Sequence, residues 1–237
     1  MKSKDLMFRI WVILSGIIII AVTFGLFLYI FYKGIGVVSA EFIFSPPKGI
    51  PLGTEGGVFP AIIGSLMSGL ISGLLGGTLG LCTAIYLNYY CRNEIIRKYI
   101  LNALQCLAGI PSVVIGLFGY TFLIVGLGIS KSLLSASVTL TVMIIPFISI
   151  RMKRALEETS KEQYISSLSL GIPKGYTIVK LVIPSAFKYI MTSLGLGTVF
   201  AMGATAPIMY TGVVIMSGVP GKLTDPFMAL PYHLYIL

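Results

Sequence analysis

The residue types of this chain that commonly carry out chemistry are few and scattered. Three cysteines, Cys82, Cys91 and Cys106, lack the spacing of a metal site, and the single histidine, His233, has no catalytic set around it in the sequence. We interpret the cysteines as small buried apolar residues and His233 as an interfacial side chain. No Gly-x-x-x-x-Gly-Lys-[Ser/Thr] phosphate loop is present. The sequence therefore predicts a non-enzymatic chain with no metal and no cofactor of its own.

The most informative polar segment is 151–180, the longest charged stretch between two apolar blocks. We expect a helix over 157–170 that ends at Gly171, because glycine suits a left-handed helix end and Pro173 cannot continue the helix. A second amphipathic stretch follows over 175–183. A long, structured, charged segment between two membrane spans indicates contact with a partner outside the membrane.

Five apolar blocks must position these residues. Of 237 residues 56% are hydrophobic and only 11% are charged, and the mean hydropathy is +0.96. A soluble domain of this size needs more charge, so buried helices of a soluble protein are the disfavoured alternative. Each block is long enough, or nearly so, to cross about 30 Å of hydrocarbon. The blocks are 8–32, 58–90, 100–127, 133–150 and 181–214.

The basic residues predict an orientation for these spans. Thirteen Lys and Arg residues fall on one side of the predicted spans and four on the other, which is the positive-inside asymmetry. It places the N-terminus, the short charged hairpin 91–99 and segment 151–180 in the cytoplasm, and segment 33–57 and the C-terminus outside. Prolines and glycines predict that 39–57 is an irregular loop. The net charge of +9 thus orients the chain and requires no nucleic acid. The first block exceeds a signal-peptide core and no cleavage site follows closely, so we expect it to be retained.

The second block contains two parallel rows of small residues. At helical spacing the rows form adjacent stripes almost without side chains, and such stripes let membrane helices approach closely. We therefore expect this helix at the centre of a bundle or at a subunit interface. One row is Ser65, Gly69, Gly73 and Gly77, and the other is Ser68, Ser72, Gly76 and Gly80.

In segment 157–184 two small residues, Ser166 and Ser167, precede Gly171, and an apolar-x-apolar-Pro group ends at Pro184. This pattern resembles the EAA loop of ABC importer permeases. The resemblance implies a coupling helix that docks into a cytoplasmic ATPase subunit. The family has an acid where this chain has Ile165, and Glu162, one turn earlier, is the candidate replacement.

Four further segments have a recognisable composition: 56–65 (GGVFPAIIGS), 109–119 (GIPSVVIGLFG), 203–207 (GATAP) and 230–235 (LPYHLY). In this order they resemble segments of the phosphate ABC transporter permeases, specifically their PstA-like subunit. The resemblance implies an all-α, polytopic bundle of the type I ABC importer permease fold, with 1–57 as the first helix and outer loop and 58–237 as the permease core.

Two of these segments contain candidate path residues. Glycines and Pro111 distort a span and free backbone polar groups, which is tolerable only within protein or beside a water-lined path. Ser112, Thr205 and Pro207 are therefore candidates for lining the translocation path. A purely structural kink is an equally good interpretation of the same residues.

The resemblance also implies partners. They are a PstC-like second permease subunit, two ATPase subunits that use ATP and Mg²⁺, and an extracytoplasmic phosphate-binding protein. The location implied is the bacterial cytoplasmic membrane, with the chain crossing it several times.

Two departures leave alternatives open. Phe200 and Ala204 stand where the family has an arginine and a glutamate, although an oxyanion needs such groups to offset its lost hydration. The sequence also shows five apolar blocks where the family has six. A permease of the same fold with a different substrate, and a truncated membrane subunit that does not transport, therefore remain alternatives to a phosphate importer.

Overall fold

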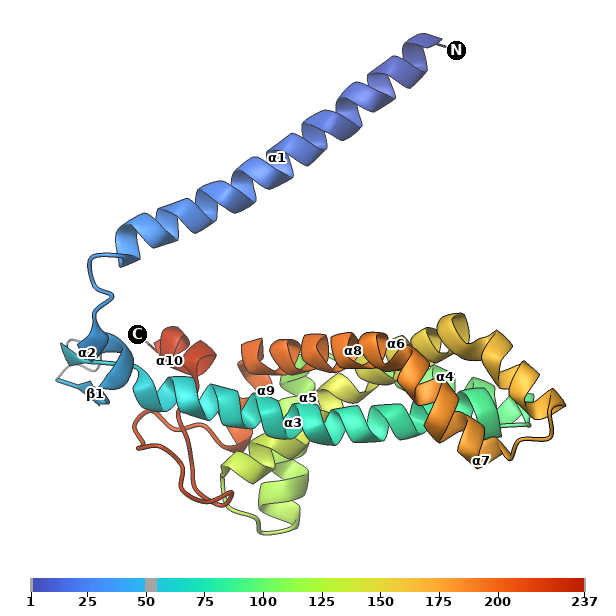
Figure 1. The fold of residues 1–237 in the computed structure, drawn as a ribbon. Coiled ribbons are helices and arrows are strands. Elements are labelled where there is room, and N and C mark those ends of the chain that lie inside the picture. Colours follow the sequence, from blue (N-terminus) through green and yellow to red (C-terminus); the bar gives the residue numbers. More distant parts are fainter. Residues whose placement is uncertain (1, 50–54, 237) are drawn as a thin grey trace. The chain divides into compact units, whose positions relative to one another are not determined.

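The computed structural model describes residues 2–49 and 55–236. The chain divides into two compact units, Met1–Val58 and Phe59–Leu237, so the boundary lies one residue beyond the predicted one. Each unit is described separately below, and Figure 1 shows the helices of both.

The first unit consists of one long apolar helix and a small folded segment. Helix α1 (Lys2–Gly34) contains a 30-residue candidate span whose apolar side chains are exposed on every face, as expected of a helix in lipid. The segment after it was predicted to be irregular and is more ordered. Helix α2 (Ala40–Phe44) begins at Ser39, which caps it, and β1 (Pro47–Lys48) pairs antiparallel with β2 (Glu55–Gly56). Residues 50–54 lie outside the described part of the chain.

Helix α3 (Phe59–Ile85), extended by a π-helical turn η1 (Tyr86–Tyr90), is the centre of the second unit. Its two stripes of small residues face different helices. Gly69, Gly73 and Gly77 lie against Met202, Thr198 and Leu194 of α8 (Ile183–Gly203). Gly76 and Gly80 lie against Ile144 and Ile148 of α6 (Leu133–Ser169), where an added Cβ would come within 2.9 Å of the isoleucine side chains. The eight residues of the two rows are all buried in this helix bundle: Ser65, Ser68, Gly69, Ser72, Gly73, Gly76, Gly77 and Gly80.

Helix α6 differs from the prediction in one respect. The membrane span and the following helix over 157–170 were expected to be separate, but α6 is a single helix of 37 residues that contains Pro146. Its buried stripe, Ile144, Ile148, Met152 and Leu156, continues without interruption from the apolar part into the charged part. The same packing therefore fixes both parts.

The chain returns through an equally continuous helical segment and then breaks. Helix α7 (Lys174–Thr177), turn η3 (Ile178–Val182) and α8 follow one another directly. The predicted span 181–214 is wrong in its second half, because α8 ends at Gly203 and a separate short helix, α9 (Ala206–Thr211), follows. Helix α10 (Leu230–Ile236) comes last, and its first amide, at Leu230, donates to Ser65 Oγ (2.8 Å).

The predicted span 100–127 is also broken. Helix α4 (Glu94–Ala108) and helix α5 (Ser112–Gly119), which continues as η2 (Tyr120–Gly126), meet at an angle of 99°. Pro111 lies at the break, as its missing amide N–H leads one to expect. Glu94 to Tyr99, predicted as part of a charged hairpin, form the first turns of α4.

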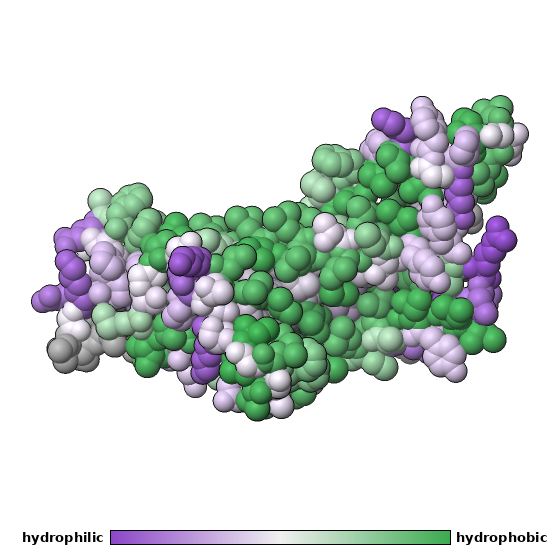
Figure 2. Space-filling model, turned by 90° about the horizontal axis from the view of Figure 1, so that it is seen from below, coloured by the Kyte–Doolittle hydropathy of each residue, from purple (hydrophilic) through white to green (hydrophobic). Residues whose placement is uncertain are grey.

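Among the described residues, four helices are long and apolar enough to cross a membrane, and the bent pair raises the number to five. Figure 2 shows that most of the visible surface is apolar, with hydrophilic side chains in separate patches. The fold is thus an all-α, multi-span membrane bundle, as the sequence predicts.

Candidate functional site

The turn between α6 and α7, residues 165–177, is called the loop corner below. Gly171 occupies it with a φ of +77°, the left-handed conformation expected of a glycine after a helix. The amide of Gly171 donates to the carbonyl of Leu168 (3.0 Å), and the amide of Ile172 donates to the carbonyl of Ser167 (3.1 Å). These two bonds satisfy carbonyls at the end of α6 and give the turn a defined shape.

Ser167 holds the loop corner together from inside. Its buried Oγ donates to Thr177 Oγ1 (2.9 Å), which donates in turn to the carbonyl of Pro173 (3.3 Å). Ser166 and Glu162, also predicted for this site, are exposed. Apolar side chains project outward beside them, and Leu170 is 79% exposed. The loop corner therefore presents an apolar surface on a rigid, internally bonded turn.

Lys174, which the sequence did not single out, ties the loop corner to the end of α3. Its Nζ donates to the carbonyl of Tyr89 and lies 4.4 Å from the centre of the Tyr90 ring. The Tyr89 ring also lies 4.6 Å from the ring of Tyr164 on α6. Burial, and secondarily the charge of Tyr90, raises the pKa of Tyr164 above its usual value, so this hydroxyl is neutral at physiological pH.

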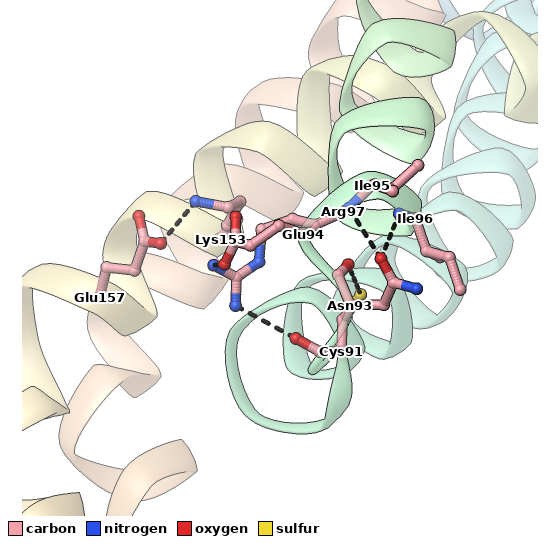
Figure 3. A network of polar contacts seen from close by, with 8 residues as sticks. All are labelled: Cys91, Asn93, Glu94, Ile95, Ile96, Arg97, Lys153 and Glu157. Carbon is pink, nitrogen blue, oxygen red and sulfur yellow. Dashed lines mark hydrogen bonds and ion pairs between the residues drawn. The ribbon is translucent and has the colours of Figure 1, made fainter.

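Two ion pairs, one on α4 and one on α6, lie close together (Figure 3). Arg97 pairs with Glu94 on α4 (3.0 Å) and donates to the carbonyl of Cys91 (3.2 Å), while Lys153 pairs with Glu157 on α6 (2.5 Å). Asn93 caps α4 by accepting from the amide of Ile95 (2.9 Å). The amide oxygen of Asn93 satisfies a free N–H at the start of α4, and the carboxylate of Glu94 suits the positive end of the helix dipole.

A cavity of about 520 Å³ opens between the end of α3, the start of α4 and α6. It is called the corner cavity below. Asn88 spans from α3 to α6 at its wall, because its Nδ2 donates to the carbonyl of Lys153 (2.9 Å). Asn88 Oδ1 and Arg97 Nε are buried and have no hydrogen-bond partner among the described residues. The lining residues are Asn88, Tyr89, Arg97, Leu156, Glu157, Glu158, Tyr164 and Ile165.

The second group of predicted residues lies at the broken spans. Ser112 is the first residue of α5, Thr205 precedes α9 and Pro207 is buried in α9. The two short helices pack closely, since a Cβ at Gly116 would lie 2.8 Å from the carbonyl oxygen of Ala206 and 3.0 Å from Pro207 Cα. The structure thus brings the helices of the three residues together, and shows no direct bond among them within its described part.

Phe200 and Ala204 lie where α8 ends. Phe200 is 55% exposed, and its ring lies 6.0 Å from that of Phe147 on α6. Arg151 in turn lies 5.3 Å from the centre of the Phe147 ring. Ala204 packs against the core. Phe200 and Ala204 therefore place an aromatic and a small apolar side chain at the two positions where the resemblance implies an arginine and a glutamate.

Sequence reasoning singled out Gly171 and Ser167 for this region and did not single out Lys174 and Asn88. Its signals were local motifs, whereas Lys174 and Asn88 acquire their places through contacts with distant segments. The single hint was that 91–99 and 151–180 were predicted to lie on the same side of the membrane.

Discontinuous spans, glycine-packed helices and a rigid apolar turn outside the spans define the class: a membrane-embedded permease component. Residues 76–229 match the family of binding-protein-dependent transport system inner membrane components, and the chain belongs to this family.

Similar proteins agree with this assignment. The phosphate transport system permease protein PstA 2 of Mycobacterium tuberculosis is 34% identical over 184 residues, which cover 77% of this chain and 61% of that protein. The probable ABC transporter permease protein YqgI of Bacillus subtilis is 28% identical over 198 residues, 84% of this chain and 67% of that protein. The probable PstA of Methanocaldococcus jannaschii is 26% identical over 184 residues, 78% of this chain and 65% of that protein.

The fold agrees as well. A chain of the inward-facing MetNI methionine ABC transporter superposes with a TM-score of 0.56 at 22% identity, covering 60% of this chain and 68% of that one. This likeness shows the fold. The chain spans 61% of the length of the PstA 2 relative.

Proposed function

We propose that this chain is the permease subunit of an ATP-driven importer of inorganic phosphate. The loop corner is the observation that carries the proposal. An exposed apolar surface on a turn locked by Gly171 and Ser167 is suited to docking on a partner, because a rigid surface loses little entropy on binding.

The loop corner is also connected to the helices that would have to move if ATP hydrolysis in a partner drives transport. It lies between α6 and α8, which both pack on the glycine stripes of α3, and Lys174 fastens it to the end of α3. A displacement of the loop corner therefore moves three packed helices as a unit. ATP and Mg²⁺ would be bound by two partner ATPase subunits, and a PstC-like second permease would complete the path.

The names of the PstA relatives support phosphate as the substrate. The residues of this chain favour a phosphate site that is shared with a second permease subunit. Ser112, Thr205 and Pro207 lie on or beside the packed pair α5 and α9, whose broken ends free backbone groups for polar contacts. Phe200 and Ala204 supply no charge, so the proposal assigns the cationic contacts for the oxyanion to the second permease. The positive-inside asymmetry of the basic segments supports a cytoplasmic N-terminus and loop corner, and the extracytoplasmic binding protein would then dock on the opposite side.

A matched pair of leucines tests the docking surface. Leu170 at the loop corner is 79% exposed, and Leu234 on α10 is 80% exposed. The variant Leu170→Glu is expected to lose co-purification with the ATPase and ATP-dependent uptake of radiolabelled phosphate into vesicles. The control Leu234→Glu is expected to keep the ATPase bound, and equal ATPase retention by both variants would refute the docking role.

The substrate is tested separately with vesicles that contain the wild-type complex. Labelled phosphate is expected to accumulate, and unlabelled arsenate is expected to compete with it because both are tetrahedral oxyanions. ATP-dependent uptake of another solute, with no phosphate uptake, would instead support a permease of the same fold with a different substrate. Loss of all transport despite an intact complex would support the non-transporting alternative.

A further inference from the structure

The corner cavity opens at the level of a membrane surface. Helix α3 and η1 together form a candidate span of 32 residues, Phe59–Tyr90, which is about 48 Å long at about 1.5 Å per residue. A bilayer with its headgroup layers is about 40–45 Å thick, so both ends of this span reach headgroup layers. Asn88 and Tyr89, in the last turn, line the cavity. The exposed rings of Tyr86 and Tyr90 agree with this level, because tyrosines are enriched at the membrane–water interface.

The wall of the corner cavity carries both signs of charge on two different helices. Arg97 contributes a cation from α4, and Glu157 and Glu158 contribute carboxylates from α6. Both carboxylates are exposed, and Figure 3 shows Glu157 and Arg97 on their two helices. A simple anion would meet the two carboxylates, and a simple cation would meet Arg97. A guest that carries one charge of each sign is complementary to both helices.

The other side chains of the wall indicate which groups carry these charges. The rings of Tyr89 and Tyr164, with centres 4.6 Å apart, belong to the wall, and aromatic faces attract ammonium groups. Asn88 Oδ1 is a buried acceptor and Arg97 Nε a buried donor, and neither has a partner among the described residues. Because unpaired buried polar atoms are costly, this wall favours a guest with N–H donors and acceptor oxygens. A primary ammonium joined to a phosphate provides both.

A second hollow continues from Arg97 along α4. Arg97 lines both hollows, so one molecule can occupy them together. Lys98 adds a cation beside Arg97, and Leu101 belongs to the apolar block 100–127. A guest that fills both hollows therefore has a charged end and an apolar end, which describes a phospholipid. The second hollow has a volume of about 290 Å³ and is lined by Glu94, Ile95, Arg97, Lys98 and Leu101.

We propose that the corner cavity binds the headgroup of a phospholipid with a primary ammonium, such as phosphatidylethanolamine. Glu157, Glu158 and the two tyrosine rings hold the ammonium, and Arg97 and Lys98 hold the phosphate. An acyl chain follows the second hollow along α4. The cavity volume of about 520 Å³ suits such a headgroup, since small-molecule sites measure about 300–1,000 Å³. This binding requires only the membrane bundle, and it is independent of the transported substrate and of docking at the loop corner.

A headgroup series tests the assignment on the full chain purified in detergent. Native mass spectrometry compares phosphatidylethanolamine, phosphatidylcholine and phosphatidylglycerol with identical acyl chains. Phosphatidylethanolamine is expected to bind about fivefold more tightly than the other two, because a quaternary ammonium has no N–H donor and the glycerol headgroup has no positive charge. Lipids on the general apolar surface do not distinguish headgroups in this way. Equal binding of the three lipids overturns the proposal.

A soluble headgroup distinguishes a lipid from a small cytoplasmic molecule. Phosphoethanolamine without acyl chains is expected to leave the lipid bound even at about 100-fold excess, because it gains nothing from the apolar hollow along α4. Displacement of the lipid at equal concentration would assign the cavity to a soluble ligand and overturn the lipid assignment.

Two variants separate the charged ends of the site. Lys98→Gln is expected to weaken phosphatidylethanolamine and phosphatidylglycerol by about threefold each, as an exposed charge pair does, because both lipids contain the phosphate. Glu158→Gln is expected to weaken phosphatidylethanolamine by about threefold and to leave phosphatidylglycerol at least as tight. The matched controls Lys180→Gln and Glu162→Gln remove exposed charges outside both hollows and should leave all affinities unchanged. Equal losses in the controls, or a loss of phosphatidylglycerol in Glu158→Gln, overturn the proposal.

Discussion

The contact between α5 and α9 permits a quantitative test through Gly116. An added Cβ would lie 2.8 Å from the carbonyl oxygen of Ala206, whereas ordinary contacts begin near 3.4 Å. The backbone of α9 must therefore move by roughly 0.6 Å, and backbone moves less easily than a side-chain end. Overpacking of this kind lowers the free energy of unfolding by about 2 kcal/mol, whereas the better helix propensity of alanine raises it by about 1 kcal/mol.

Gly195→Ala is the matched control, because nothing lies within 4 Å of its Cβ position. It gains the same helix propensity, about 1 kcal/mol, without a steric cost. The two variants should thus differ by about 2 kcal/mol, or roughly 4–8 °C in the midpoint of thermal unfolding for a chain of this size. The assay is thermal unfolding in detergent followed by intrinsic fluorescence. Equal midpoints for the two variants would refute the close packing of α5 on α9.

Three further predictions concern the loop corner and α10. Gly171→Ala should lower the free energy of unfolding by about 1 kcal/mol, because its φ of +77° strains alanine, and Gly171→Asn should lose less, as measured by thermal unfolding. Lys174→Met should raise hydrogen exchange across 165–177, since it removes the bond to the Tyr89 carbonyl and the contact with the Tyr90 ring, while unchanged exchange would contradict the tie. Burial lowers the pKa of His233, so the folded state resists protonation. The attachment of α10 should therefore be strongest above the unfolded-state pKa of about 6.5 and weaken as pH falls through the lowered value. Proteolysis of α10 between pH 7.5 and 5 measures this, and His233→Gln should remove the pH dependence.

The sequence predicts features that depend on local chemistry. The stripes through Gly73 and Gly76 were visible because helical spacing alone places small residues on one face, and the structure packs them against α8 and α6. Gly171 was visible for a similar reason, since a helix end followed by Pro173 requires a residue that accepts a positive φ.

Features that depend on distant contacts were not predicted. The end of α8 at Gly203 has no local signal strong enough to show that Val199 and Ile208 belong to different helices. The 99° bend at Pro111 was predicted only as a distortion, because the angle is set by packing of α5 on α9. The place of Lys174 depends on Tyr89, 85 positions away in the chain.

The uninterrupted course of α6 restricts which insertions and deletions its gene can tolerate. One residue added between Arg151 and Glu157 would turn everything beyond it by about 100° and shift it by about 1.5 Å. The loop corner would then leave the side of the bundle on which Lys174 meets α3. An insertion or deletion of seven residues restores the orientation of the following part of α6 to within about 20°, but it lengthens or shortens the helix by about 10 Å. Among working variants of this protein, the length of segment 133–169 should therefore be nearly constant, while the connection between α9 and α10 is free of this helical constraint.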